Sequence, residues 1–462
     1  MANDNEQGPN VALPLREVDP DALKVVRKLL ANGHEAYLVG GCVRDLYLRR
    51  RPKDFDVATS ATPEQIRKTF RNSRIIGRRF KLAHVFFGPK IIETSTFRTT
   101  PVAADDDDLL ITRDNEWGNI EDDARRRDFT INGLFHDLEA NRIVDLVDGI
   151  PDLERGVIRT IGDPLVRFQE DPVRMIRAIK FAARLDFTIE EATWEALLDT
   201  VGDITKCARA RLLEEVYKLL RGGASRRSFE LLLESGLFPY VLPSYDELFR
   251  ERTEVGLVRS QRFPKGKDDA PLATGYHPSR LFWELLDALD EYTIETGQEA
   301  SNGVILAVLL APIIDQEWIS ASRRDLDRTI DATMEGLCAP LGVARRDREL
   351  ARQILMAHRR MVGTAKRRRR RPSLVQRQYF HDALVFLGIA VQARGEDDSE
   401  FAHWQRLAAT VAPMVASDDG PPRSSGGSKG GDDKRRRRGG RSRRRGRSSG
   451  SGGRSSRASD RG

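Results

Sequence analysis

The chain has 462 residues, with 77 Lys and Arg, 70 Asp and Glu, three Cys and a sequence pI near 9.3. This length exceeds one ordinary domain of about 100–200 residues, so we expect about two or three domains. The cysteines, Cys42, Cys207 and Cys338, are far apart, which excludes a disulfide framework and a zinc ribbon and favours a reducing, cytoplasmic setting. No basic region leads into an apolar run at the start, and the longest apolar stretch, residues 303–314, is shorter than the about 20 residues of a membrane span. We therefore expect no secretory signal and no membrane contact.

The positive charge lies at one end of the chain. Residues 420–462 contain 15 Lys and Arg against three Asp, whereas residues 1–419 contain 62 basic and 67 acidic residues. The last segment is almost entirely Gly, Ser and Arg, without a large apolar residue to anchor it. We predict a disordered basic tail over residues 416–462 whose charge suits contact with nucleic-acid phosphates without sequence preference.

The first third of the chain alternates helix and strand patterns. Residues 1–19 are polar and aperiodic and are predicted to be disordered. Thr62 and Pro63 open a helix with Gln65 at the capping-box position. The other expected elements are a helix over 22–30 and strands over 37–39, 55–58, 85–87 and 91–97. These patterns predict a small α/β head with a mixed sheet over residues 20–160.

Strand patterns almost disappear after residue 150. Helical periodicity, interrupted by Gly or Pro, recurs over 171–185, 209–221, 229–233, 280–291, 303–314, 346–361 and 376–392. We predict a helical neck over residues 161–245 and a helical body over residues 246–415. The expected fold class is α+β, with an α/β head followed by a mostly α-helical body and the basic tail.

Two carboxylates mark the strongest candidate site. Asp54 and Asp56 flank Phe55 at the start of a predicted strand, where alternation places both on one face, about 6.6 Å apart along the backbone. Such a pair can bridge two Mg²⁺ ions, an arrangement that stabilises the entering and leaving oxygens in phosphoryl or nucleotidyl transfer. An isolated Asp-x-Asp is more often a solvated strand edge, so the neighbouring motifs must decide.

Gly40 and Gly41 lie between a predicted strand and a predicted helix. Without side chains they let backbone N–H groups at the positive end of the helix approach a phosphate. Arg44, one turn later, can point at the same phosphates. A lone Gly-Gly pair usually serves only a tight turn, but its combination with Arg44 and with Asp54 ten residues later is far more specific.

Together these motifs resemble a known family. LVGGCVRDLYL (38–48) followed by PKDFDVAT (52–59) resembles the nucleotidyltransferase signature of the family that unites tRNA CCA-adding enzymes with bacterial poly(A) polymerases. The resemblance continues, in the family's order, in RRRDFTIN (125–132), EDPVRMIRAIKFAARL (170–185) and ARLLEEVYKLL (210–220). It is strong over residues 22–245 and looser to about residue 400. It implies a nucleotidyltransferase head.

The RRRDFTIN motif contains adjacent opposite charges. Arg127 and Asp128 form a charge pair that could bind triphosphate and a ribose hydroxyl, or an exposed ion pair worth less than about 1 kcal/mol. The resemblance implies that Arg127, Asp128 and Asn132 help to hold the triphosphate and the sugar.

The EDPVR motif has two interpretations. Asp171 followed by Pro172 is typical of a helix N-cap with Pro at the first helical position. Alternatively, Asp171 is an acceptor beside the donors Arg174 and Arg177 on one helix face. The resemblance implies that Asp171 and Arg174 face the nucleobase edge like a template, because a carboxylate and a guanidinium can together distinguish adenine or cytosine.

Three further features have weaker interpretations. Glu93 is a candidate third catalytic carboxylate beside Asp54 and Asp56, or a surface acid on a strand. The run Asp105–Asp108 is more typical of a solvated loop than of a metal site. His84 is expected to be packed or hydrogen-bonded rather than to act as a general base.

Two features favour one branch of the family. Gly77–Phe80 followed by Leu82–Val85 resembles the version typical of bacterial poly(A) polymerases, and the basic runs Lys366–Arg371 and Lys434–Arg447 are similar to their Arg-rich extensions. We therefore expect a template-independent poly(A) polymerase that adds AMP from ATP to RNA 3′ ends with two Mg²⁺ ions. RNA-degradation machinery is a candidate partner. The alternatives are a CCA-adding tRNA nucleotidyltransferase that uses CTP and ATP, and a non-catalytic RNA-binding protein.

Overall fold

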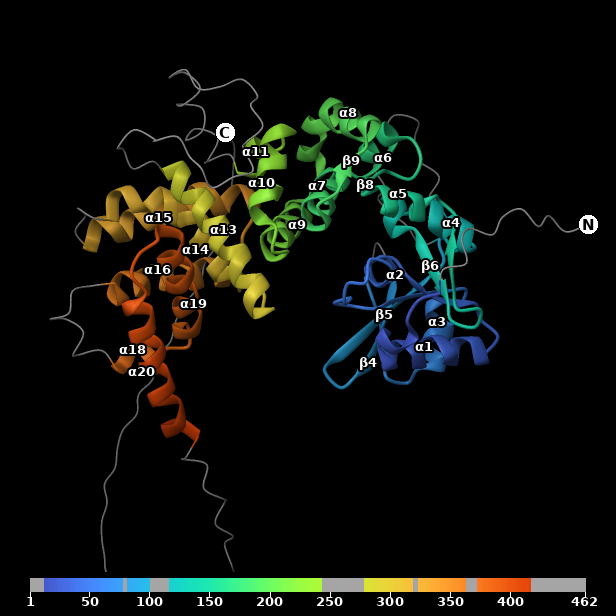
Figure 1. Cartoon of the computed structure of the whole chain (residues 1–462), viewed down its shortest axis with the longest axis horizontal. Coiled ribbons are helices and arrows are strands. Elements are labelled where there is room, and N and C mark those ends of the chain that lie inside the picture. The colour runs from blue at the N-terminus through green and yellow to red at the C-terminus, as the bar shows by residue number, and fades with distance from the viewer. Residues whose placement is uncertain are drawn as a thin grey trace, which may run out of the picture. The chain divides into compact units, whose positions relative to one another are not determined.

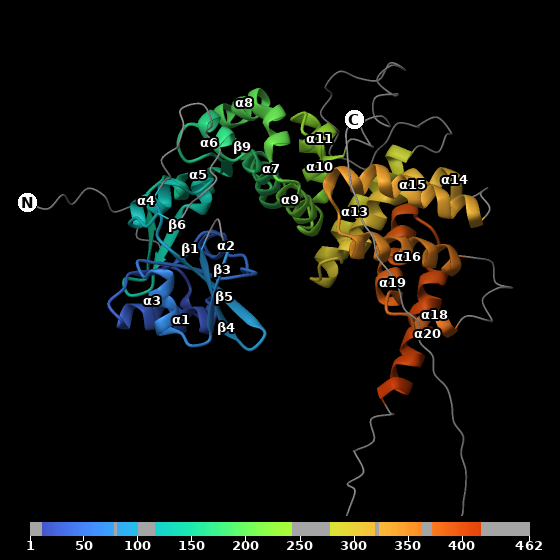
Figure 2. The same cartoon turned by 180° about the vertical axis from the view of Figure 1, so that it is seen from behind.

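Figures 1 and 2 show the chain, a computed structural model, from two opposite sides. The structure describes residues 12–77, 81–99, 116–242, 278–318, 323–362 and 372–416. The chain divides into two compact units, Met1–Ala412 and Pro413–Gly462. Several segments with predictions lie outside the described residues: 1–11, 78–80, Asp105–Asp108, Lys366–Arg371 and the basic tail after residue 416.

The head is built on one seven-stranded sheet in the order β3-β4-β5-β2-β1-β6-β7. Figure 1 labels β4, β5 and β6 of this sheet. Strands β2 and β5 run parallel, and each other neighbouring pair is antiparallel. The strands are β1 Ala36–Val39, β2 Asp56–Thr59, β3 Ser73–Ile76, β4 Leu82–Phe87, β5 Lys90–Thr96, β6 Leu134–Asp137 and β7 Arg142–Asp145. The sequence did not predict β3, β6 and β7, because four-residue strands that contain Arg, His or Asp show little alternation.

Helix α1, Pro20–Ala31, packs against this sheet. The Asp19 carboxylate caps it by accepting hydrogen bonds from the amides of Asp21 at 2.8 Å and Ala22 at 3.4 Å. The buried residues of α1 are spaced as one helix face: Ala22, Val25, Val26 and Leu29. The helix predicted over 22–30 is confirmed.

The segment before α1 corrects the prediction that residues 1–19 are disordered. Leu15–Glu17 form a short 3₁₀ helix, η1, and Leu13 and Val18 on either side of it are buried in the hydrophobic core. Two apolar side chains five residues apart match neither helix nor strand spacing, so periodicity did not reveal them. The prediction is wrong for residues 12–19.

The remaining head helices connect the strands, and α3 lies beside α1 in both views (Figures 1 and 2). The predicted capping box of α3 is confirmed, because Thr62 Oγ1 accepts from the Gln65 amide and Gln65 Oε1 accepts from the Thr62 amide. The helices are α2 Gly41–Tyr47, α3 Pro63–Thr69, α4 Ile120–Arg125 and α5 Gly149–Arg155, with the 3₁₀ turn η2 Thr130–Asn132.

The neck is helical except for the strand β9 Thr188–Ile189, which pairs in parallel with β8 Val157–Ile158 at the end of the head. The neck helices are α6 Pro164–Glu170, α7 Val173–Leu185, α8 Glu191–Thr200, η3 Val201–Lys206, α9 Arg209–Arg221, α10 Ser225–Glu234 and α11 Phe238–Val241. Helix α9 has the bounds that its periodicity predicted.

Helices joined by short connections are the only regular elements among the described residues of the body. Its helices are α13 Pro278–Thr296, α14 Asn302–Trp318, α15 Arg323–Leu341, α16 Arg345–Met361, α18 Pro372–Val375, α19 Phe380–Arg394 and α20 Ser399–Ala416. The helix predicted over residues 303–314 is confirmed in α14, and its residues 304–311 are all buried. The search of the described helices for one long and apolar enough to cross a membrane finds none. The α+β class, with a mixed-sheet head and a helical body, is confirmed.

Candidate active site

Three carboxylates of the head lie at the junction of β2 and β5. Asp56 is the first residue of β2 and lies opposite Glu93 of the parallel strand β5. Asp54 precedes the strand by two residues and is exposed. Burial and the charge of Glu93 raise the pKa of Asp56 to about 6; Arg127 opposes this shift and Asp54 adds to it. The three predicted acids therefore repel one another, which a bound divalent cation would relieve.

The donor set fits an oxygen-liganded cation such as Mg²⁺. Glu93 is partly engaged elsewhere, because its Oε1 lies 3.5 Å from Nε2 of His84 on β4. His84 is half-buried and its ring packs against Phe86, as expected for a packed histidine. No cluster of three or more His, Cys, Asp or Glu side chains with metal-ligand spacing occurs among the described residues. The candidate metal site is therefore the predicted pair, Asp54 and Asp56.

The glycine turn lies next to this pair, because Val39 of β1 is paired with Asp56 and Gly40 follows Val39. Gly40 has a φ of +74° and a Cβ atom there would lie 3.4 Å from Nη1 of Arg127. The Gly40 amide donates to the carbonyl of Leu134, so it is engaged in the sheet. The amides that could face a phosphate are those that follow, at the beginning of α2.

Arg44 lies beside the turn but is pinned by neighbouring side chains. Its Nη1 donates to Asn132 Oδ1 at 2.6 Å and its Nε donates to Asp45 Oδ1 at 2.8 Å, and the side chain is buried. A Cβ atom at Gly41 would lie 3.6 Å from Arg44 Nη2, so the guanidinium stays close to the glycine turn. Arg44 Nη2 also lies 2.7 Å from Asp45 Oδ1, so Arg44 is near the expected phosphate position with all three of its guanidinium nitrogens already engaged.

Asp128 joins the head to the neck. Its carboxylate accepts hydrogen bonds from Arg177 Nε at 2.7 Å and from Asn132 Nδ2 at 3.1 Å. Burial alone would raise the pKa of Asp128, but the Arg177 charge and these hydrogen bonds hold it well below its ordinary value. Together with the bond between Arg44 and Asn132, this makes a continuous polar chain from the glycine turn to helix α7.

Arg127 does not pair with Asp128, which corrects the predicted charge pair. Its Nη2 donates at 2.7 Å to Asp123, whose carboxylate is fully buried and is shared with Arg126. Adjacent residues here point to different partners: Arg127 toward the sheet, where it lies over the Phe135 ring, and Asp128 toward the neck. Arg127 remains the cation nearest the glycine turn and also acts on Asp56.

Asp171 is not the N-cap of α7, which corrects one of its two interpretations. Helix α7 begins at Val173 after Pro172 and has no side-chain cap. The Asp171 carboxylate instead accepts two hydrogen bonds of 2.8 Å from Nη1 and Nη2 of Arg211 on α9. Sequence reasoning missed Arg211, although it lies in the ARLLEEVYKLL motif and a bidentate partner for an aspartate is typically an arginine.

Arg174 is buried and belongs to a second polar chain. Its Nη1 donates at 2.8 Å both to Glu170 Oε2 and to the carbonyl of Arg167. Arg167 in turn donates from Nη1 to Glu170 and from Nη2 to the carbonyls of Arg126 and Arg127, at 2.6 Å each. Glu170 and Arg167, which sequence reasoning did not single out, therefore connect the candidate base-reading residue to the backbone of the RRRDFTIN motif.

The chain matches two family models and several curated proteins. "Poly A polymerase head domain" matches residues 36–159, and "Probable RNA and SrmB- binding site of polymerase A" matches residues 186–249. Poly(A) polymerase I of Salmonella typhi is 45% identical over 256 residues, which cover 54% of this chain and 55% of that protein. This chain thus spans little more than half the length of the Salmonella protein.

Other relatives include both branches of the family. Poly(A) polymerase I of Escherichia coli O6:H1 is 41% identical over 314 residues, which cover 64% of this chain and 67% of that protein. A CCA-adding enzyme of Lactobacillus delbrueckii subsp. bulgaricus is 40% identical over 226 residues, covering 48% of this chain and 56% of the enzyme.

One solved structure shares the fold over most of its length. The CCA-adding enzyme of Bacillus stearothermophilus, solved in complex with CTP, superposes with a TM-score of 0.55 at 24% identity, covering 87% of this chain and 90% of that one. Since the Escherichia coli relative also matches at 41% identity over two thirds of its length, the chain belongs to the nucleotidyltransferase family that contains the bacterial poly(A) polymerases and the CCA-adding enzymes.

Proposed function

We propose that the protein is a template-independent polynucleotide adenylyltransferase that adds AMP from ATP to RNA 3′ ends. The observation that carries the proposal is the position of Asp56, between Glu93 on one side and the glycine turn with Arg127 on the other. Carboxylates beside a phosphate-binding turn are the parts that nucleotidyl transfer requires. Identity of 41–45% to poly(A) polymerase I supports adenylate addition within this family.

In this proposal Asp54 and Asp56 hold two Mg²⁺ ions, which when bound would neutralise charge at the reacting phosphate and the pyrophosphate. Asp56 must be ionised for this role, and its pKa of about 6 leaves it mostly ionised at neutral pH. Glu93 keeps the local potential negative. Arg127 supplies a fixed positive charge next to Gly40, where the triphosphate would lie against backbone amides.

The sugar end of the nucleotide would lie over the polar chain of Arg44, Asn132, Asp128 and Arg177. Because these side chains are hydrogen-bonded to one another before any ligand arrives, their donors and acceptors are already oriented. Such a preformed floor is suited to bind a ribose hydroxyl. It would also fix the nucleotide relative to the carboxylates.

Asp171 and Arg174 would read the base edge. Arg211 holds the Asp171 carboxylate in one orientation, with accepting capacity left on its oxygens. The hydrogen bonds of Arg174 to Glu170 and Arg167 use Nη1, so Nε and Nη2 are the donors proposed to face the base. A carboxylate that accepts from an exocyclic amine and a guanidinium that donates to a ring nitrogen match adenine.

RNA 3′ ends and ATP are the proposed substrates. The neck and body would hold the RNA, and the basic tail would add contacts without sequence preference. A cytoplasmic location and a partnership with RNA-degradation machinery stay predictions from the sequence.

Product length and nucleotide choice test the proposal. The full-length protein is incubated with Mg²⁺ and each of the four NTPs, on an unstructured RNA and on a tRNA that lacks its CCA end. We expect long A tracts on the unstructured RNA and poor use of CTP. Efficient CTP use that is confined to the tRNA and stops after three additions would instead establish the CCA-adding alternative, which the Lactobacillus relative supports.

A third result would favour the non-catalytic alternative. If no NTP is incorporated under any condition while RNA still binds, the protein is an RNA-binding protein on a nucleotidyltransferase fold.

The matched control for the metal assignment is Asp54→Asn, which removes one candidate metal ligand from an exposed position and therefore leaves the fold intact. Incorporation that survives unchanged in this variant would overturn the metal assignment.

A further inference from the structure

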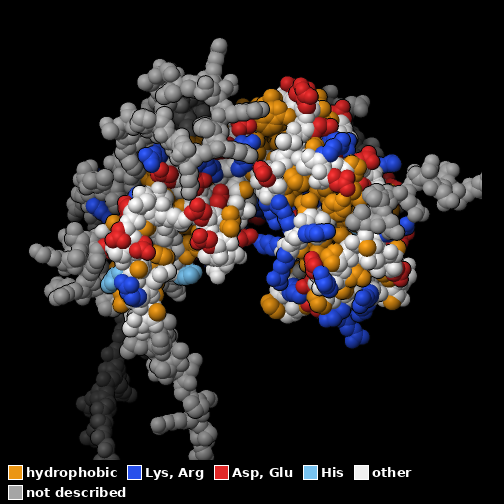
Figure 3. Space-filling view, viewed as in Figure 1, with side chains coloured by type: hydrophobic (Ala, Val, Ile, Leu, Met, Phe, Trp, Pro, Cys, Tyr) orange, Lys and Arg blue, Asp and Glu red, His pale blue; other side chains and the backbone are white. Residues whose placement is uncertain are grey.

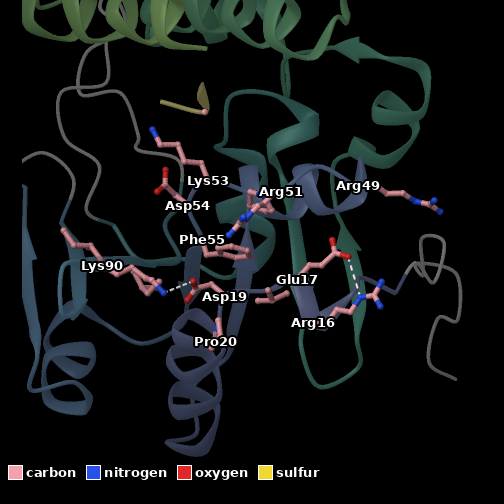
Figure 4. A pocket seen from close by; sticks show the side chains of 15 residues that line it. Arg16, Glu17, Asp19, Pro20, Arg49, Arg51, Lys53, Asp54, Phe55 and Lys90 are labelled. Atoms are coloured by element: carbon pink, nitrogen blue, oxygen red, sulfur yellow. Dashed lines mark hydrogen bonds and ion pairs between the residues drawn. The ribbon is translucent and has the colours of Figure 1, made fainter. Parts of the chain in front are cut away.

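A pocket formed by head residues and by Gly297 of the body shares Asp54 with the candidate active site (Figure 4). The cavity of about 1160 Å³ is lined mainly by residues 16–20 around η1, by the loop 49–55 before β2, and by residues 90–92 of β5. Neither Gly40 nor Arg127 belongs to this lining. Because β2 lies between β1 and β5, the glycine turn flanks Asp56 on the β1 side and this pocket flanks it on the β5 side.

Two ion pairs neutralise the lower part of the pocket. Lys90 Nζ lies 2.8 Å from an Asp19 carboxylate oxygen, and Arg16 Nε lies 3.7 Å from Glu17 Oε1 (Figure 4). Asp19 is also engaged as the N-cap of α1. These four side chains form a polar wall without a net charge, so the charge of the pocket depends on the loop before β2.

The loop before β2 carries cations that no acidic side chain of this wall neutralises. Arg51 and Lys53 are exposed, line the cavity and lie next to Asp54 in sequence. Arg51 has no ion pair with the residues that the structure describes, and Lys53 makes only an exposed contact with Glu299, of the kind that a ligand displaces at little cost. Arg49 lines the edge and points outward in Figure 4. Lys and Arg side chains also gather on the face of the head shown in Figure 3.

An aromatic ring completes the pocket. Phe55 is half-buried between Asp54 and Asp56 and belongs to the lining. Cations that follow a backbone, combined with an aromatic face on which a base stacks, are the usual means of binding single-stranded nucleic acid. A small anion such as pyrophosphate would use the cations but not the ring.

We propose that this pocket binds the single-stranded RNA just upstream of its reacting 3′ end, with Arg51 and Lys53 against backbone phosphates and Phe55 stacked on a base. The inference rests on the proposed function and deepens it, because it assigns the RNA a path. The nucleotide occupies the β1 side of the carboxylates and the RNA reaches them from the β5 side. An in-line displacement requires the attacking and leaving groups to lie on opposite sides of the reacting phosphate.

The test compares two double variants of the full-length protein, Arg51→Ala with Lys53→Ala and, as the matched control, Arg67→Ala with Lys68→Ala. The control removes the same charge from exposed positions on α3, outside the pocket lining. Extension of a labelled A12 oligonucleotide gives KM for RNA and for ATP, and anisotropy gives its Kd without ATP. All variants keep the basic tail, so its contribution cancels.

We expect the pocket variant to raise KM and Kd for the oligonucleotide about tenfold, and to reduce the slope of log Kd against log salt by about 1.4, which corresponds to two single-strand phosphate contacts. KM for ATP should change less than twofold, and the control should match the wild type. Phe55→Leu should weaken RNA binding about tenfold, whereas Phe55→Tyr keeps the ring and should restore it.

Three results would overturn the inference: pocket and control variants that behave alike, a rise confined to KM for ATP, or equal RNA binding by the Leu and Tyr variants. Failure of the proposed function is a separate result. If the wild type extends no RNA and anisotropy still depends on Arg51 and Lys53, the pocket binds RNA in a protein of another activity. If extension proceeds normally in the pocket variant, only the pocket assignment is wrong.

Discussion

The carboxylate of Asp128 in the head accepts a 2.7 Å hydrogen bond from Nε of Arg177 on the neck helix α7. This contact, and the bonds of Asn132 to Asp128 and Arg44, connect three motifs through residue pairs that are 49 and 88 positions apart in the sequence. The proposed nucleotide site is therefore assembled by tertiary contacts between side chains, and each motif depends on the others for its orientation.

Arg177→Ala should destabilise the fold by about 3 kcal/mol at pH 7, because it leaves the buried Asp128 carboxylate without its cation. The pKa of Asp128 lies below its ordinary value of 3.8, so the stability that this carboxylate contributes is present above pH 3.8 and is lost as the pH falls further. In urea unfolding, the difference in the free energy of unfolding between wild type and variant should become smaller below about pH 4.

The double variant Asp128→Asn with Arg177→Ala is the control for this pair. In the Asp128→Asn background, Arg177→Ala should lower the free energy of unfolding by less than it does in the wild type. If the two substitutions lower the free energy of unfolding additively, Asp128 and Arg177 do not stabilise each other.

Asp56→Asn should stabilise the metal-free protein by about 2 kcal/mol at pH 7.5. The folded-state pKa of Asp56 is about 6 against an ordinary 3.8, so its contribution to stability is present below pH 3.8 and is lost as the pH rises through 6. Differential scanning calorimetry in EDTA should show a higher Tm for the variant at pH 7.5 and little difference at pH 4.

With Mg²⁺ present, the wild type rather than Asp56→Asn should have the higher Tm. Binding of Mg²⁺ to the proposed ligands Asp54 and Asp56 should raise the Tm of the wild type, whereas the Asn variant lacks one charged ligand and its Tm should respond weakly. Nucleotide addition by Asp56→Asn should fall by about a thousandfold, since the carboxylate pair supplies several kcal/mol of charge stabilisation. An active variant without a Tm gain would refute both the repulsion and the metal assignment.

Gly40→Ala should raise KM for ATP about tenfold. Its φ of +74° strains any side chain, and the added Cβ, in ordinary contact 3.4 Å from Nη1 of Arg127, would occupy space at the turn where the triphosphate is proposed to lie. Gly88→Ala is a matched control, because Gly88 has a φ of +61° with no atom within 4 Å of the new Cβ. Both variants should lose about 1 kcal/mol of stability, and only the first should lose ATP affinity. Equal KM values in steady-state kinetics would show that the triphosphate does not lie against Gly40.

Arg211→Ala should reduce the preference for ATP over CTP about tenfold while changing the unfolding free energy by less than about 1 kcal/mol. The pair with Asp171 is partly exposed, so its contribution to stability is small, but it fixes the orientation of the proposed base acceptor. The measurement is kcat/KM for each nucleotide. Arg211→Lys retains the positive charge but cannot make the bidentate contact. Its preference for ATP over CTP should lie between those of the wild type and the Ala variant. Unchanged selectivity in the Ala variant would remove Asp171 from base recognition.

Local patterns predicted the parts of the fold that local energetics decide. The α3 capping box and the bounds of α9 depend on residues within a few positions of one another, and both are confirmed. Strand β6 was missed because its four residues are held by pairing with β1 and β7, which sequence spacing does not show. Helix α15 was missed although its buried Ile330, Met334 and Leu337 have helical spacing.

The candidate site shows the same division. Asp54, Asp56 and the glycine turn are local motifs, and the structure brings them together at one end of β1 and β2. The partners of Asp171 and Arg167 lie about 40 residues away, so only tertiary structure could identify them. The predicted pairing of Arg127 with Asp128 was wrong because neighbours in sequence rarely face each other.

The hydrogen bonds of Arg167 to two backbone carbonyls restrict where the head of one family member can be joined to the neck of another. Arg167 reaches from α6 to the backbone of residues 126 and 127, and strand β8 pairs with β9 across the predicted boundary at residue 160. A chimera joined at that boundary would have to import a neck that supplies both the guanidinium for these carbonyls and the guanidinium for Asp128. Exchange of head and neck as a single block, from residue 12 to residue 242, would preserve all of these contacts.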